Sequence, residues 1–143
     1  MNSGAAQPPP PDGFPPGPFR LRVEADPANL ALVRAQLRQW FPAARIDPET
    51  AADLLLAVGE AASNAAEHAP IGARHRVMLT VTASITAAGV RLVVSDDGCW
   101  REPPESPGFR GHGLRLIAAL VDTMRLTPTP HGTTVDMTKE STR

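Results

Sequence analysis

The stretch "EAASNAAEHAP" at residues 60–70 repeats polar groups at the spacing of one helical face. Glu60 and Asn64 lie four residues apart, and Glu67 and His68 follow seven and eight residues after Glu60. On a helix of about 3.6 residues per turn these side chains would form one stripe. A carboxylate can serve as a general base and an amide oxygen can bind a hard cation, but by itself such a stripe is most often a solvated surface.

The helix that carries this stripe is predicted over residues 48–67, because Asp-Pro at residues 47–48 supplies an N-cap residue and a first-turn proline. The same pair at residues 26–27 predicts a helix that ends near residue 41. The apolar arc of the longer helix lies opposite the polar stripe on a helical wheel. It consists of Leu54, Leu55, Val58, Ala61, Ala62 and Ala65.

Alternating apolar and polar residues predict strands on both sides of these helices. The predicted strands cover residues 19–24, 77–86, 90–95, 123–128 and 133–138, and a third helix covers about 114–121. The predicted order is strand, helix, helix, strand, strand, helix, strand, strand. This order favours an α/β (α+β) two-layer sandwich in which helices cover one face of a mixed, largely antiparallel sheet.

Composition narrows the class of protein. The 143 residues suffice for one domain, which we expect over residues 19–140, after a proline-rich tail at 1–18 that we expect to be disordered. A net charge of −1 gives no electrostatic reason for binding nucleic acid or an anionic membrane. The sequence has no apolar run near the ~20 residues of a membrane span, and it has a single cysteine, Cys99. We therefore expect a cytoplasmic protein.

Two further segments carry groups that can bind a nucleotide. In "VVSDDGCW" (residues 93–100), Asp96 ends a buried strand and could accept a hydrogen bond from an exocyclic amine, although Asp-Gly is also a common turn signal. In "GFRGHGLRLI" (residues 108–117), Gly111 and Gly113 come directly before the third predicted helix. Unpaired N–H groups at a helix start favour phosphate, although a lone pair of glycines is weak evidence.

Taken together, these segments resemble the motifs of the GHKL ATPase superfamily. "EAASNAAEHA" is similar to its N box, "DDG" to its first glycine box, "GHGL" to its second, and "HGTTVDM" to its last strand. Within the superfamily the sequence most resembles the anti-sigma-factor serine/threonine kinases of bacteria, which share the patterns seen here in "GHGLRLIAALVD" and "GTTVDM". The resemblance covers about residues 19–138.

The resemblance implies ATP and Mg²⁺ as ligands and assigns roles at the phosphate end of the site. Glu60 would be the base that activates the attacking hydroxyl, and Asn64 would coordinate Mg²⁺. Gly111 and Gly113 would offer backbone N–H groups to the phosphates, with Leu114 starting the helix beneath them.

At the adenine end, the resemblance implies that Asp96 binds the amino group and that Gly98 lets the chain pass close to the ring. Thr133 would complete this end of the pocket. His68 matches the histidine of the N box, where packing and direct contact are both open roles.

The resemblance further implies a homodimeric kinase that phosphorylates a STAS-domain anti-anti-sigma protein and sequesters a sigma factor. One departure from the pattern is Trp100, which stands where the first glycine box usually has its second glycine, and the lid that follows is short and rich in proline. The alternative is therefore a non-catalytic module that binds nucleotide or sequesters a partner. A further alternative to the kinase is the catalytic fragment of a histidine kinase.

Overall fold

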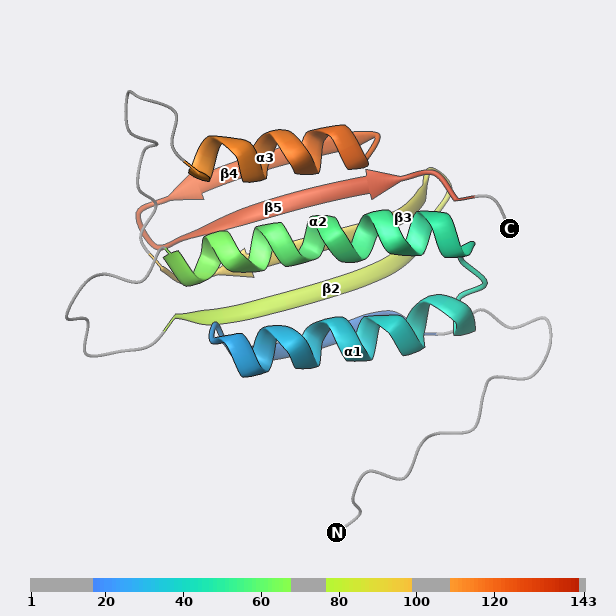
Figure 1. Ribbon diagram of the computed structural model, residues 1–143, viewed down its shortest axis with the longest axis horizontal. Coiled ribbons are helices and arrows are strands. Elements are labelled where there is room, and N and C mark those ends of the chain that lie inside the picture. Colours follow the sequence, from blue (N-terminus) through green and yellow to red (C-terminus); the bar gives the residue numbers. More distant parts are fainter. Residues whose placement is uncertain (1–16, 68–76, 99–108, 142–143) are drawn as a thin grey trace, which may run out of the picture.

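The computed structural model describes residues 17–67, 77–98 and 109–141. Five strands and three helices follow one another in the predicted order (Figure 1). They are β1 (Phe19–Glu24), α1 (Pro27–Ala43), α2 (Pro48–Glu67), β2 (Met78–Thr86), β3 (Gly89–Asp96), α3 (Phe109–Leu120), β4 (Thr123–Thr129) and β5 (Gly132–Lys139). The predicted start and end of α2 are both confirmed.

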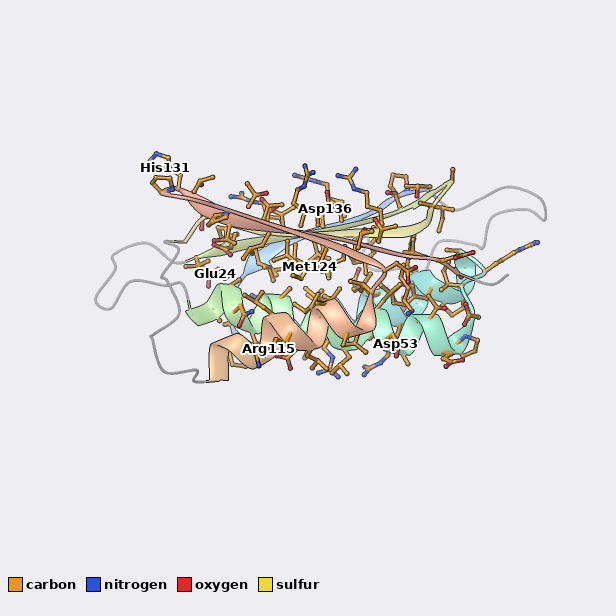
Figure 2. The ribbon with its side chains drawn as sticks, turned by 90° about the horizontal axis from the view of Figure 1, so that it is seen from above. Glu24, Asp53, Arg115, Met124, His131 and Asp136 are labelled. Carbon is orange, nitrogen blue, oxygen red and sulfur yellow. The ribbon has the colours of Figure 1, made fainter. Side chains whose placement is uncertain are left out.

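The strands form one sheet in the order β1-β2-β3-β5-β4, and every neighbouring pair is antiparallel. The three helices lie side by side on one face of this sheet, with α2 between α1 and α3 (Figures 1 and 2). The predicted two-layer fold is therefore confirmed, and the sheet is antiparallel rather than mixed among the described strands. Two hairpins, β2–β3 and β4–β5, account for two of the four pairings, because a short turn can join only antiparallel strands.

Both predicted helix starts are capped as the Asp-Pro pairs indicate. The Asp26 carboxylate accepts from the backbone N–H of Asn29 at 2.8 Å. The Asp47 carboxylate accepts from the backbone N–H of Thr50 at 3.0 Å. Each cap satisfies one of the N–H groups that a helix start leaves without an intrahelical partner. The local sequence therefore fixes where α1 and α2 begin.

The core fills the space between the helices and the inner face of the sheet. In α2, Leu54, Val58 and Ala61 are buried as the apolar arc predicts, whereas Leu55 is only half-buried. From the sheet, alternate residues point toward the helices, among them Leu92 and Met137, which are fully buried. Each large apolar side chain that is buried contributes about 1.5–3 kcal/mol. This packing holds α2 against the sheet.

The other face of the sheet is polar, and none of the described helices covers it (Figure 2). Arg91 of β3 donates from Nε and Nη2 to the two carboxylate oxygens of Asp136 on β5, at 3.1 and 2.6 Å. These hydrogen bonds from Arg91 lower the pKa of Asp136 below its ordinary value of 3.8, assisted by the charges of Arg91 and Arg125. The pair ties two neighbouring strands together on the solvent side.

We expect Asp136→Asn to make the melting temperature less dependent on pH in the acid range. A carboxylate whose pKa is lowered in the folded state makes its full contribution to the stability of the protein when the pH is above its unfolded pKa. That contribution is lost as the pH falls through the folded pKa. The melting temperature of the parent should therefore fall more steeply than that of Asp136→Asn below about pH 4. Thermal melts between about pH 2 and pH 6 measure this. Parallel profiles for the two proteins would contradict the assignment.

The third helix begins earlier than predicted. The glycines were expected to precede a helix from about Leu114, but α3 already begins at Phe109 and contains both Gly111 and Gly113. Glycine lowers helix propensity by about 1 kcal/mol per residue, which is why the sequence pattern places the start too late. Tertiary packing against α2 overrides this local preference.

Candidate functional site

Glu60 and Asn64 of α2 face the start of α3 rather than open solvent. Glu60 and Asn64 are both half-buried. A Cβ atom added to Gly113 would lie 3.1 Å from Oε2 of Glu60 and 3.6 Å from both Oδ1 and Nδ2 of Asn64. Gly113 therefore brings the backbone of α3 close to both functional groups, which a larger residue would push away. The structure places Gly113 beside two residues that lie about 50 positions earlier in the sequence.

The earlier helix start changes what each glycine can offer. The N–H groups in the first turn of an α-helix have no intrahelical acceptor, and in α3 these include residues 109–111. Gly111 lies among them, so its N–H remains a candidate donor to an anion. Gly113 lies two residues further on, beyond the first turn, and the contact with Glu60 and Asn64 is its clearest role. Leu114 is half-buried and packs against the core cluster.

The second group of predicted site residues lies where β3 ends and β5 begins. Asp96 and Thr133 are register partners on these antiparallel strands, so both side chains point to the helix-covered face. Asp96 is half-buried, and its Oδ1 accepts from the backbone N–H of Gly98 at 2.9 Å. This hydrogen bond closes the turn that follows β3 and fixes the direction of the carboxylate.

Thr133 carries an orphaned polar atom. The residue is 3% exposed, and its Oγ1 has no hydrogen-bond partner in the part of the chain that the structure describes. A buried hydroxyl without a partner costs about 1–3 kcal/mol. An unpaired group of this kind beside Asp96 is suited to receive a hydrogen bond from a ligand, or to donate one to it.

Thr133→Val should therefore separate stability from ligand binding. Valine has the shape of threonine without the hydroxyl, so we expect the melting temperature of the ligand-free protein to stay equal or to rise. The same substitution should weaken ATP binding by about tenfold, because a hydrogen bond to the ligand is lost. Differential scanning fluorimetry and calorimetric titration measure the two effects. A large loss of stability in the ligand-free protein would show that the hydroxyl has a structural partner.

Gly132 lets the start of β5 lie directly against the end of β3, a role that the sequence did not reveal. Its φ is +153°, and an added Cβ would overlap the backbone carbonyl of Asp96. Only glycine allows β5 to start so close to the end of β3. In the sequence, "HG" before the last strand reads as an ordinary turn signal, so the close approach to Asp96 was not predicted.

All these groups lie at one end of the molecule. The end of α2, the start of α3, the end of β3 and the start of β5 meet at the left of Figure 1. His68, Trp100 and the lid at 99–108, for which the sequence suggested roles, lie outside the described residues, as does the proposed tail up to residue 16.

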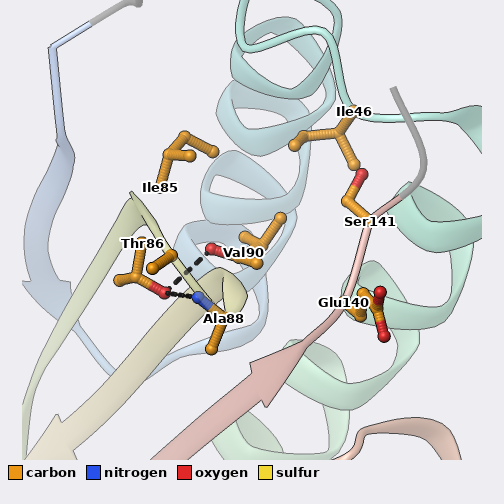
Figure 3. A pocket seen from close by; sticks show the side chains of 9 residues that line it. Ile46, Ile85, Thr86, Ala88, Val90, Glu140 and Ser141 are labelled. Carbon is orange, nitrogen blue, oxygen red and sulfur yellow. Dashed lines mark hydrogen bonds between the residues drawn. The ribbon is translucent and has the colours of Figure 1, made fainter.

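A cavity of about 670 Å³ lies at the opposite end of the sheet, beside the β2–β3 turn (Figure 3). Two of its hydroxyl groups have protein partners: the Thr86 hydroxyl donates to the Gly89 carbonyl at 3.1 Å, and the Ser141 hydroxyl donates to Asp47 at 3.1 Å. No predicted site residue lines this cavity. It is therefore separate from the candidate nucleotide site.

No group of three or more His, Cys, Asp or Glu side chains in residues 17–67, 77–98 and 109–141 could hold a metal ion by itself. None of the described helices combines the length and apolar character that crossing a bilayer requires.

Comparison with known proteins identifies the family. The family model of the histidine kinase-like ATPase domain matches residues 23–139. The chain belongs to the histidine kinase-like ATPase family. The match covers most of the 143 residues and includes both groups of site residues, and it confirms the superfamily that the motifs indicated.

A solved structure resembles this histidine kinase-like ATPase domain as a whole. It is the crystal structure of the RsbU and RsbW domains of Rv1364c from Mycobacterium tuberculosis. The two chains are 30% identical with a TM-score of 0.72, and the match covers 90% of this chain and 34% of the other. The present chain thus spans about a third of the length of that protein.

Proposed function

We propose that this protein binds ATP at the end of the sandwich where α2, α3, β3 and β5 meet, and that it is an anti-sigma factor with serine/threonine kinase activity. The observation that carries the proposal is the approach of Gly113 to Glu60 and Asn64. It supports a site in which a general base, an amide oxygen and the start of a helix lie together. The Asp96–Thr133 pair supports a second, base-binding region at the same end.

The residues fit a nucleotide bound with Mg²⁺. Asn64 presents an amide oxygen, a hard donor of the kind that Mg²⁺ accepts alongside phosphate oxygens. When bound, Mg²⁺ would neutralise charge on the phosphates. Gly111, at the start of α3, would donate its N–H to the phosphates, and the positive end of the helix dipole would favour them. At the adenine end, Asp96 and Thr133 would bind the base, and Gly98 would let it approach.

In the proposed reaction, Glu60 accepts the proton of a serine or threonine hydroxyl on a partner protein. The hydroxyl oxygen forms a bond to the terminal phosphorus of ATP, and the bond from that phosphorus to the bridging oxygen breaks, which releases ADP. The half-buried position of Glu60 places its carboxylate next to the start of α3, where the phosphates would lie. Phosphoryl transfer depends mainly on such positioning and on charge neutralisation.

For the partners, we propose a STAS-domain anti-anti-sigma protein as phosphate acceptor and a sigma factor as the sequestered target, with a homodimer as the active form. The 30% identity to a chain that contains an RsbW domain supports this assignment. We also propose that residues 19–140 form the folded unit, which agrees with β1 starting at Phe19.

A second candidate function is a non-catalytic module that binds nucleotide and regulates by sequestration alone. The observation in its favour is Trp100, which replaces the second glycine of the first glycine box. An indole at this position would stiffen the hinge of the lid, and turnover would suffer more than binding.

Two measurements on the full chain separate these functions. Calorimetric titration with ATP and Mg²⁺ tests binding, and transfer of label from [γ-³²P]ATP to candidate STAS-domain proteins tests catalysis. Binding with transfer supports the kinase, and binding without transfer to any candidate supports the non-catalytic module. Absence of binding would contradict both functions.

A further inference from the structure

The turn that presents Asp96 is held by its neighbour, Asp97. Oδ1 of Asp97 accepts from the backbone N–H of Met78, the first residue of β2, at 2.7 Å. The backbone N–H of Asp97 donates in return to the carbonyl of Met78 at 3.2 Å. Asp97 is exposed and lies one residue beyond the end of β3. One residue thus makes two hydrogen bonds to the first residue of the adjacent strand.

The side chain of Asp97 replaces a backbone group of the sheet. Leu79 and Asp96 are the last register partners of β2 and β3, so Met78 and Asp97 stand at the next position. In a regular antiparallel ladder, a pair of this kind exchanges two backbone hydrogen bonds. Here the Asp97 carboxylate, rather than its carbonyl, receives the Met78 N–H. The chain can therefore leave the sheet at Asp97 without leaving the first N–H of β2 unsatisfied.

This exit from the sheet shapes the candidate adenine site. Directly after Asp97, the N–H of Gly98 donates to Oδ1 of Asp96, so the turn folds back onto the carboxylate that the proposed function assigns to the base. On the other side, Gly132 lies against the carbonyl of Asp96 and the Cα of Asp97. The direction of the Asp96 carboxylate depends on this turn, and Asp97 is the residue that anchors the turn to β2.

We propose that Asp97 is a positioning residue for nucleotide binding: it acts through the turn and Asp96 and does not touch the ligand. The proposal rests on the proposed function, because it presumes ATP at Asp96. It assigns a role to the middle residue of "DDG", which in the sequence reads as part of a turn signal.

Three variants of the full chain test the proposal by calorimetric titration with ATP and Mg²⁺. Asp97→Ala removes the acceptor and should raise the Kd for ATP by about fivefold to tenfold. Asp97→Asn removes the same charge but keeps an amide oxygen that can accept from Met78, so its Kd should stay within about twofold of the parent. The comparison of these two variants isolates the hydrogen bond from the charge.

Asp122→Ala is the matched control. Asp122 is also exposed, and its Oδ2 accepts from the backbone N–H of Glu140 at 2.6 Å, at the end of the sheet away from Asp96. It loses a similar contact between a side chain and the backbone, and its Kd for ATP should match that of the parent. The proposal is overturned if Asp97→Ala binds as the parent does, if Asp97→Asn binds as weakly as Asp97→Ala, or if Asp122→Ala shows an equal loss.

Hydrogen exchange of backbone amides supplies a readout that needs no ligand. In Asp97→Ala, the amides of Met78 and Gly98 should exchange about tenfold faster than in the parent, whereas in Asp122→Ala they should not change. If the parent binds no ATP, the proposed function fails, and the exchange of Gly98 still decides whether Asp97 holds the turn. Unchanged exchange at Gly98 in Asp97→Ala would overturn the positioning role in either case.

Discussion

Glu60→Gln should reduce phosphate transfer to a STAS-domain acceptor by about 10²–10⁴-fold, the usual contribution of a general base. Glutamine keeps the size of the side chain beside Gly113 but cannot take the proton of the attacking hydroxyl. Because Glu60 would act on the acceptor and not on the nucleotide, the Kd for ATP should stay within about twofold of the parent. Single-turnover transfer of label from [γ-³²P]ATP, together with calorimetric titration, measures both quantities.

Glu49→Gln provides the control on the same helix. Glu49 is exposed in the first turn of α2, far from the start of α3, and its substitution should change neither transfer nor binding. Equal transfer rates in Glu60→Gln and the parent would exclude Glu60 as the base. A loss of ATP binding in parallel with transfer would instead place Glu60 among the groups that hold the nucleotide.

Asp96→Asn should weaken ATP binding by about 10²-fold, because the amino group of adenine loses a charged hydrogen-bond acceptor. The amide oxygen of asparagine can still accept from the N–H of Gly98, so the turn should keep its shape. The NH₂ group then stands where an acceptor for the adenine amino group is needed. Two donors facing each other in a half-buried site are unfavourable, which makes this substitution more costly than the loss of a neutral hydrogen bond.

Tryptophan fluorescence is a convenient measurement for this variant. The chain has two tryptophans, and Trp40 packs edge-on against Phe19 and Phe41, so Trp40→Phe leaves Trp100 as the only reporter. Titration with ATP in this background should quench or enhance the signal of Trp100 in the parent and not in Asp96→Asn. Asp122→Asn, at the other end of the sheet, should titrate as the parent does. Equal affinity of Asp96→Asn and the parent would exclude Asp96 from the site.

Much of the fold could be predicted because its signals are local. The carboxylates of Asp26 and Asp47 cap the helices that follow them, and the two prolines fix the first turns, so α1 and α2 begin where the sequence indicates. The period-two alternation in 77–86 identifies β2 in the same way. The predicted start of α3 was wrong, because glycine does not favour a helix in the sequence pattern. The packing of Gly113 against α2 determines where this helix begins.

The candidate site, like the fold, could be predicted from the sequence only in its local features. The amino-acid sequence by itself determined which functional groups the protein has and, apart from Gly111 and Gly113, on which elements they lie, because motif spacing and helical periodicity are properties of neighbouring residues. Only the tertiary structure decided that Gly113 approaches Glu60 and Asn64, that Gly132 lies against Asp96, and that the buried Thr133 hydroxyl has no partner among the described residues. These contacts join residues far apart in the chain, and packing of the whole core sets their distances.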